Sequence, residues 1–150
     1  MDFKKLANQY RDELLDSVLP FWLEHSQDGE YGGYFSCLDR EGKVFDTDKF
    51  IWLQGREVWM FSMLYNKVEK RQEWLDCAVQ GGEFLKKYGH DGNYNWYFSL
   101  YRSGRPLVEP YNIFSYTFAT MAFGQLSLAT GNQEYADIAK KTFKIILSKV

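Results

Sequence analysis

One arginine stands in a part of the sequence where a charge is unexpected. Arg56 lies in the middle of residues 49–66, KFIWLQGREVWMFSMLYN, which are predicted to form a helix that is apolar on nearly every side. At helical spacing its neighbours are Trp52, Trp59 and Met63, so the guanidinium is predicted to share one stripe with two indoles. Such a planar fork of donors beside aromatic rings can bind the oxygens of a ligand or stabilise an oxyanion.

Two interpretations of Arg56 remain open from the residues alone. The arginine could pair with a buried carboxylate from another helix and so fix the packing. It could instead face a cavity, where Arg56 would offer a planar fork of donors to a ligand oxygen and Trp52 would offer an apolar face to a ligand ring.

Other residue types that often carry chemistry give weaker signals. His25 and His90 lie at a predicted helix end and in a glycine-rich loop, so we assign them no catalytic role. The run 46–49, Asp-Thr-Asp-Lys, could suggest a cation site, but a charged hairpin exit that caps the following helix is the favoured interpretation. Cys37 and Cys77 lack CxxC spacing, so we expect reduced thiols and neither a disulfide nor a metal site.

Composition limits the class of protein. The 150 residues are 45% hydrophobic and 19% aromatic, which is enough for the core of one globular domain. The net charge of −2, with mixed signs along the chain, gives no basic stripe for nucleic acid or for a membrane surface. The N-terminus lacks the apolar core of a signal peptide, and no apolar stretch approaches the roughly 20 residues that span a bilayer. We therefore expect a cytoplasmic protein whose partner is small or neutral.

Five helices are predicted, and they are of two kinds. Three have one polar and one apolar face: residues 2–24, 73–88 and 133 onward. Two are apolar all round: residues 50–65, with Arg56 and Glu57 as their charges, and residues 113–131, with none. A helix that is apolar on all sides is buried or lines a cavity. Amphipathic helices, with one polar face toward solvent, therefore alternate along the chain with helices that are apolar all round.

The segments between these helices repeat. Tyr-Phe-Ser at residues 34–36 recurs at residues 97–99, within two predicted hairpins at residues 32–45 and 95–108. One unit is therefore an outer helix, a hairpin and an inner helix, and such units need neighbours to bury their faces. In the second outer helix, the pair Gly81-Gly82 is expected to allow a close approach of its neighbours.

The predicted fold is all-α, the leading part of a double-layered α/α toroid in which outer and inner helices alternate and short β-hairpins gather on one rim. An ordinary bundle with two added hairpins is the alternative, and hairpins at the same place in both units argue against it. Residues 1–150 would hold about two and a half helix pairs of one domain, without an internal boundary, so we expect a fragment of a longer protein. The inner helices should lie side by side and approximately parallel. Six of their residues should be shielded: Leu53, Trp59, Met60, Phe118, Met121 and Phe123.

Residues 21–66, which begin FWLEHSQDGEYGGYF and end WLQGREVWMFSMLYN, resemble the N-terminal signature of the N-acyl-D-glucosamine 2-epimerase family. A looser similarity continues through GGEFLKKYG, YRSGRPL and NIFSYTFATMAFGQLSLATGNQEYADIA, and so covers essentially the whole chain. The resemblance implies an (α/α)6 barrel of which this chain is the N-terminal portion.

The resemblance also implies an activity. The family interconverts N-acetylglucosamine and N-acetylmannosamine through C2 deprotonation and reprotonation, and close relatives epimerise cellobiose or isomerise mannose. No organic redox cofactor is implied. An arginine at the place of Arg56 is an active-site residue in the family, while two histidines from later inner helices, expected beyond residue 150, act as bases. Tyr116 stands where many members carry an acid, so it is a candidate substrate-binding residue that leaves the N-acetyl specificity open. A homodimer is a further expectation.

Two rivals from other classes remain. A glycoside hydrolase on the same toroid would need a pair of Asp or Glu residues in the cavity, and the inner helices carry only Glu57. A binding module would use the aromatic excess as an exposed patch. The later inner helices would distinguish the three: two histidines there would indicate an epimerase, paired acids a hydrolase, and neither a binding module.

Overall fold

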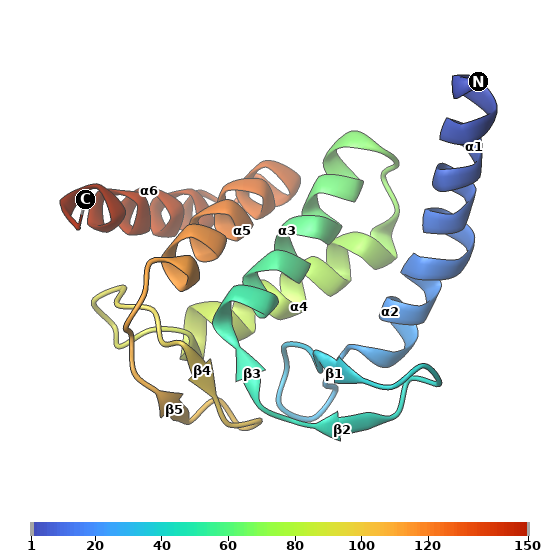
Figure 1. The fold of residues 1–150 in the computed structure, drawn as a ribbon. Helices are drawn as coiled ribbons and strands as arrows, with labels where there is room; N and C mark the ends of the chain where they lie inside the picture. The colour runs from blue at the N-terminus through green and yellow to red at the C-terminus, as the bar shows by residue number, and fades with distance from the viewer. Residues whose placement is uncertain (1, 150) are drawn as a thin grey trace.

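The computed structural model describes residues 2–149 and contains the five predicted helices, two of them with small hairpins before them (Figure 1). In chain order the elements are α1 (Phe3–Glu13), a π-helical segment (Leu14–Val18), α2 (Leu19–His25), β1 (Cys37–Leu38), β2 (Val44–Asp46), β3 (Lys49–Phe50), α3 (Ile51–Lys67), α4 (Gln72–Tyr88), β4 (Ser99–Leu100), β5 (Pro106–Val108), α5 (Phe114–Thr130) and α6 (Gln133–Ser148). Within residues 2–149, no helix is both long and apolar enough to cross a membrane.

The first predicted helix exists, but it is not a uniform α-helix. It starts behind Asp2, whose side chain accepts a hydrogen bond from the backbone N–H of Lys5 at 3.1 Å. Its middle is π-helical, and α2 then carries Pro20 in its first turn. Proline has no N–H to donate to the carbonyl four residues earlier, and a π-helical turn accommodates such a break in the ladder.

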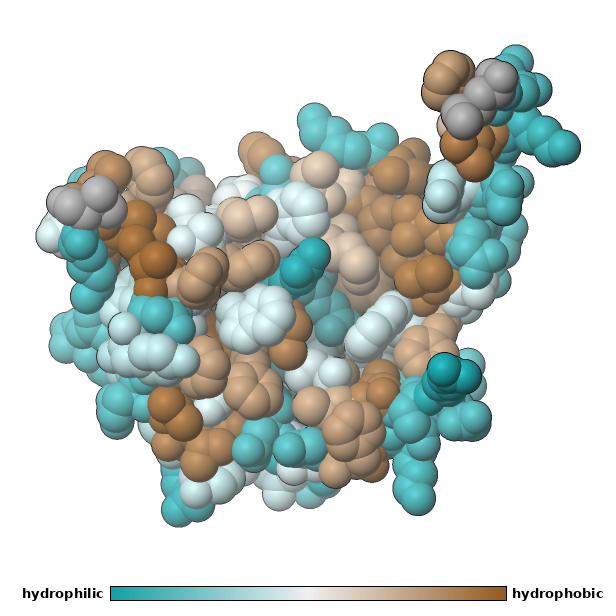
Figure 2. Space-filling view, in the orientation of Figure 1, coloured by the Kyte–Doolittle hydropathy of each residue, from teal (hydrophilic) through white to brown (hydrophobic). Residues whose placement is uncertain are grey.

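α1 stands away from the body of the molecule (Figure 1). The sequence predicted one polar and one apolar face for the first helix. None of the α1 residues is buried, and Phe3 and Tyr10 on the apolar face are 75% and 70% exposed. Contact of this helix with the core begins at Leu14 and Leu15. Figure 2 shows a hollow between α1 and the body, with hydrophobic residues along it.

α3 and α5 form the inner layer, side by side and running in about the same direction, as predicted (Figure 1). They approach closely at Gly55, where an added Cβ would lie 3.0 Å from the backbone of Phe118. α4 packs on α3 and α6 packs on α5, so each inner helix has an outer partner. The two-layer prediction is confirmed.

The shielding of the six selected inner-helix residues is uneven. Phe123 is fully buried, while four are partly buried: Leu53, Trp59, Met60 and Phe118. Met121 is 37% exposed, so the prediction is wrong for this residue, because no described element covers its side of α5.

Both predicted hairpins are present. β1 pairs antiparallel with β2, with Cys37 opposite Asp46, and β4 pairs with β5, with Ser99 opposite Val108. Isolated bridges between Gln27 and Tyr34 in the first unit, and between His90 and Trp96 in the second, support the internal repeat. β3 also pairs with β4, a contact that the sequence did not predict, and it ties the start of α3 to the second hairpin.

Candidate active site

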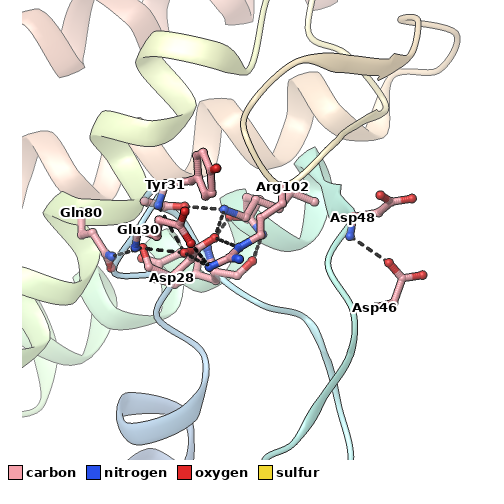
Figure 3. A network of polar contacts seen from close by, with 11 residues as sticks. Asp28, Glu30, Tyr31, Asp46, Asp48, Gln80 and Arg102 are labelled. Carbon is pink, nitrogen blue, oxygen red and sulfur yellow. Dashed lines mark hydrogen bonds and ion pairs between the residues drawn. The ribbon is translucent and has the colours of Figure 1, made fainter.

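A buried ion network holds the segment from which α3 starts. Lys49, in β3, is fully buried, and its Nζ lies 2.9 Å from Asp28 Oδ2 and 2.5 Å from the carbonyl oxygen of Gly32. Arg102, from the second hairpin, donates to both oxygens of Asp28 at 2.9 and 3.0 Å (Figure 3). One carboxylate therefore joins the loop after α2, the strand before α3 and the hairpin of the next unit.

The charges of this network follow from its contacts. Burial alone would raise the pKa of Asp28, but hydrogen bonds from Arg102 and Lys49 outweigh it and hold that pKa well below its usual range. Burial lowers the pKa of Lys49, and the partner Asp28 opposes this shift. A carboxylate with two cationic partners is stable in such a site, whereas either cation alone would be costly there.

The expected helix cap at residues 46–49 is wrong. The residue before α3 is Phe50, with no capping side chain, and Lys49 points into the core instead. The Asp46 side chain accepts the backbone N–H of Asp48 at 2.8 Å, which is a local turn contact (Figure 3). Among residues 2–149, no three His, Cys, Asp or Glu side chains are placed to hold a metal ion.

Arg56 lines a cavity of about 230 Å³ between α2 and α3. The residues around the cavity are Trp22, Ser36, Leu53, Arg56, Glu57 and Met60. Arg56 is exposed, and within residues 2–149 its guanidinium makes no hydrogen bond, ion pair or contact over an aromatic ring. The described chain thus contains no buried carboxylate partner for Arg56, and the stacking on indoles is also absent.

Trp52 lies one turn before Arg56 and borders a second hollow of about 350 Å³. This hollow is lined by Trp52, Phe98, Asn112, Phe114 and Phe118. The rings of Trp52 and Phe118 lie 5.9 Å apart, so α3 and α5 each contribute an aromatic wall. A lining of flat rings with a single amide suits the apolar face of a sugar.

Tyr116 lies elsewhere. Its side chain is 2% exposed, and its hydroxyl donates to Asn95 Oδ1 at 3.3 Å. It borders a third hollow, with Pro110, Tyr111, Asn112, Ile113 and Lys149. The structure therefore brings Arg56 and Trp52 together on one helix but does not bring Tyr116 to the cavity of Arg56.

Glu57 and Ser26 were missed as site residues. Glu57 lines the Arg56 cavity, and its Oε1 lies 2.5 Å from the Ser26 hydroxyl oxygen. Burial raises the pKa of Glu57 to about 8, a shift that the hydrogen bond with Ser26 opposes. Glu57 could have been found in the sequence, because it is one of two charged residues in an otherwise apolar helix. Ser26 could not, because it is 31 residues from Glu57 and no sequence pattern near it indicates the contact.

The two histidines and two cysteines lie outside the cavity lining. His25 packs on Phe21 with ring centroids 4.9 Å apart. His90 Nδ1 accepts the backbone N–H of Gly92 at 3.0 Å, and burial lowers the pKa of His90. Cys37 and Cys77 are free thiols.

The chain was compared with known proteins. A family model described as N-acylglucosamine 2-epimerase (GlcNAc 2-epimerase) matches residues 33–150. The N-acylglucosamine 2-epimerase of Mus musculus is 47% identical over 128 residues, which are 83% of this chain and 30% of the mouse protein. The cellobiose 2-epimerase of Dictyoglomus turgidum is 29% identical over 148 residues, which are 97% of this chain and 38% of that protein.

The solved structures give the same result. The cellobiose 2-epimerase structure from Bacillus thermoamylovorans matches with a TM-score of 0.86 and 30% identity, over 95% of this chain and 37% of the other. The described helices and hairpins therefore match part of an (α/α)6 toroid, as predicted, and the chain spans about a third of the length of these relatives. Since the family model covers most of the residues, the chain belongs to the N-acylglucosamine 2-epimerase family.

Proposed function

We propose that this chain is the N-terminal part of an epimerase that interconverts N-acetylglucosamine and N-acetylmannosamine. The observation that carries the proposal is the exposed Arg56 guanidinium, which lines a cavity on an inner helix and has no partner within residues 2–149. Sequence identity favours the N-acetyl sugar, since it is 47% with the mouse N-acylglucosamine 2-epimerase and 29% with a cellobiose 2-epimerase.

In the proposed reaction, a base removes the weakly acidic proton at C2 of the open-chain sugar, and a proton returns on the opposite face. Negative charge develops on the carbonyl oxygen as the proton leaves, and Arg56 would donate hydrogen bonds to this oxygen. Trp52 would bind an apolar face of the sugar in the hollow next to it. The two bases are expected outside this chain, on later inner helices.

Other parts of the sequence-based proposal stay predictions. Tyr116 would have to turn its hydroxyl away from Asn95 before it could bind the sugar. A cytoplasmic location and a homodimer are also proposed for the full-length protein.

The test is isotope exchange in the full-length protein that carries this chain. Incubation with N-acetylmannosamine in deuterated water should give N-acetylglucosamine with deuterium at C2, which mass spectrometry and proton NMR both detect. N-acetylglucosamine that forms without any deuterium would point away from free proton transfer. Parallel incubations with cellobiose and mannose separate the proposed substrate from those of a disaccharide 2-epimerase and an aldose-ketose isomerase.

A glycoside hydrolase is the second candidate, and Glu57 is the observation in its favour. A carboxyl whose pKa is raised can serve as the general acid of such an enzyme. The lining of the cavity, however, has no second carboxylate to act as its nucleophile or base. Release of monosaccharides from a disaccharide would support the hydrolase.

A further inference from the structure

The contacts of Glu57 indicate where its proton lies. The Ser26 hydroxyl oxygen is 2.5 Å from Glu57 Oε1 and 2.6 Å from the carbonyl oxygen of Trp22. A serine hydroxyl has a single proton, so it can donate to only one of these two oxygens. Two oxygens this close repel unless a proton lies between them. Both contacts are favourable together when Ser26 donates to Trp22 and a protonated Glu57 donates to Ser26.

We propose that Glu57 is a positioning residue that stays protonated in the working enzyme and so leaves the guanidinium of Arg56 free for the substrate, an inference that rests on the proposed function. The two side chains line the same cavity. An ionised Glu57 would place a carboxylate there, where water screens its attraction to a guanidinium less than at an open surface. The guanidinium would then be held by the protein's own carboxylate instead of by a sugar oxygen.

The surroundings single out Glu57 as the group that changes charge near neutral pH. Burial raises its pKa to about 8. Burial also raises the pKa of the Tyr34 phenol and of the Cys77 thiol, which face Glu57 from the loop before β1 and from α4, so both stay neutral. α2 carries two titratable residues, Glu24 and His25, of which His25 is next to Ser26 and supplies the control variant.

The first experiment observes the proton directly in the full-length protein. A protonated carboxyl has an infrared C=O band that a carboxylate lacks. The wild type should show such a band at about pH 6.5, which should disappear with a midpoint near pH 8, against about 4.3 for an ordinary glutamate. Glu57→Gln should lack the band, since glutamine has the same shape without the acid. A wild-type spectrum identical to that of Glu57→Gln at about pH 6.5 would overturn the inference.

The second experiment tests the consequence for Arg56. Between pH 7 and pH 9, wild-type kcat/KM for N-acetylmannosamine should fall about tenfold relative to that of Glu57→Gln, because a group with a pKa near 8 passes from mostly protonated to mostly ionised in this range. His25→Asn should keep the wild-type profile. A constant ratio between wild type and Glu57→Gln, or loss of the fall in His25→Asn instead, would refute the role of Glu57.

If Glu57→Gln does not fold, a second variant can replace it in both experiments. Glu57→Met has a similar length, is neutral, and should show the same loss of the band and of the pH-dependent fall. A wild type without epimerase activity at any pH would contradict the proposed function. In that case the infrared titration still decides whether Glu57 is protonated. A failure of the proposed function can therefore be told apart from a failure of the inference about Glu57.

Discussion

Among single residues, the exposed Arg56 differs from the basic side chains of the ion network. Lys49 and Arg102 both contact Asp28, whereas Arg56 has no carboxylate partner in the described chain. In the full-length protein, Arg56→Lys should lower epimerase turnover by on the order of 10²-fold, because lysine keeps the charge but loses the planar fork of donors. The midpoint of thermal unfolding should stay nearly unchanged. Steady-state kinetics and calorimetry on one preparation measure both.

Arg105→Lys is the matched control for this substitution. Arg105 is an exposed arginine of the second hairpin that lies over the ring of Tyr101, so its replacement should leave turnover at the wild-type level. An Arg56→Lys protein that unfolds early but keeps its turnover per folded molecule would refute the catalytic assignment and indicate a structural ion pair.

Glu57 gives a prediction for stability as well as for activity. Its pKa is about 8 in the folded chain and about 4.3 when unfolded, so between these values the folded state holds a proton that the unfolded state has released. The free energy of unfolding should therefore fall as pH rises, by at most about 1.4 kcal/mol per pH unit. Urea titrations of the wild type and Glu57→Gln at pH 5, 6, 7 and 8 measure this. Parallel pH dependences in the two proteins would contradict it.

Asp28 is the residue on which the ion network depends. Asp28→Asn would leave Lys49 buried without its carboxylate, so the free energy of unfolding should fall by about 3–5 kcal/mol. Lys49→Met should cost much less, because Arg102 still pairs with Asp28 and methionine fills the buried space. Denaturant titrations of the two variants give the comparison. Equal losses in both variants would contradict the central role of Asp28 in the network.

At the scale of elements, a glycine sets how closely the loop before β1 lies against α4. An added Cβ on Gly81 would overlap the hydroxyl of Tyr34, which is fully buried and donates to the carbonyl of Cys77 at 2.7 Å. Gly81→Ala should therefore destabilise the protein by about 1–3 kcal/mol, through overpacking and strain on this hydrogen bond. Differential scanning calorimetry should show a lower Tm.

At Gly124, the same glycine-to-alanine substitution should have the opposite effect on stability. It lies within α5, and a Cβ there would meet nothing within 4 Å. Gly124→Ala should raise the stability by about 0.4–1 kcal/mol, because alanine restricts the unfolded chain and favours the helix. If Gly81→Ala were as stable as Gly124→Ala, the close contact with Tyr34 would not limit the packing.

The sequence predicts elements well where the signal is periodic and poorly where distant residues meet. Hydrophobic spacing predicted all five helices, and aromatic-rich segments around glycine-containing turns predicted both hairpins. The π-helical segment was missed, since the apolar period continues through it. The ion network was also missed, because Asp28 lies 21 residues from Lys49 and 74 from Arg102. The residue type predicted Arg56 as a site residue, but only the structure showed that Glu57 contacts Ser26, 31 residues away in the sequence.

At the scale of the whole molecule, the described chain is a two-layer wedge with uncovered apolar edges. One edge is on α1, where Phe3 and Tyr10 are exposed. The other is on α5 and α6, where Leu128, Phe143 and Leu147 are 71%, 50% and 60% exposed. Helical repeats bury such faces against neighbouring repeats, and this chain spans about 30% of its mammalian relatives. We therefore expect these edges to be buried in the full-length protein.

This expectation gives the last prediction, which concerns residues 1–150 produced alone. Because exposed apolar patches drive association, this chain should bind a hydrophobic dye such as ANS and form concentration-dependent oligomers in size-exclusion chromatography with light scattering. Leu128→Lys with Phe143→Lys should reduce both signals, while Lys67→Arg, a charge-preserving change at an exposed site, should not. The isolated chain should also lack epimerase activity, since the proposed bases lie outside it. A monomeric chain that binds no dye would show that its edges do not need the neighbouring repeats.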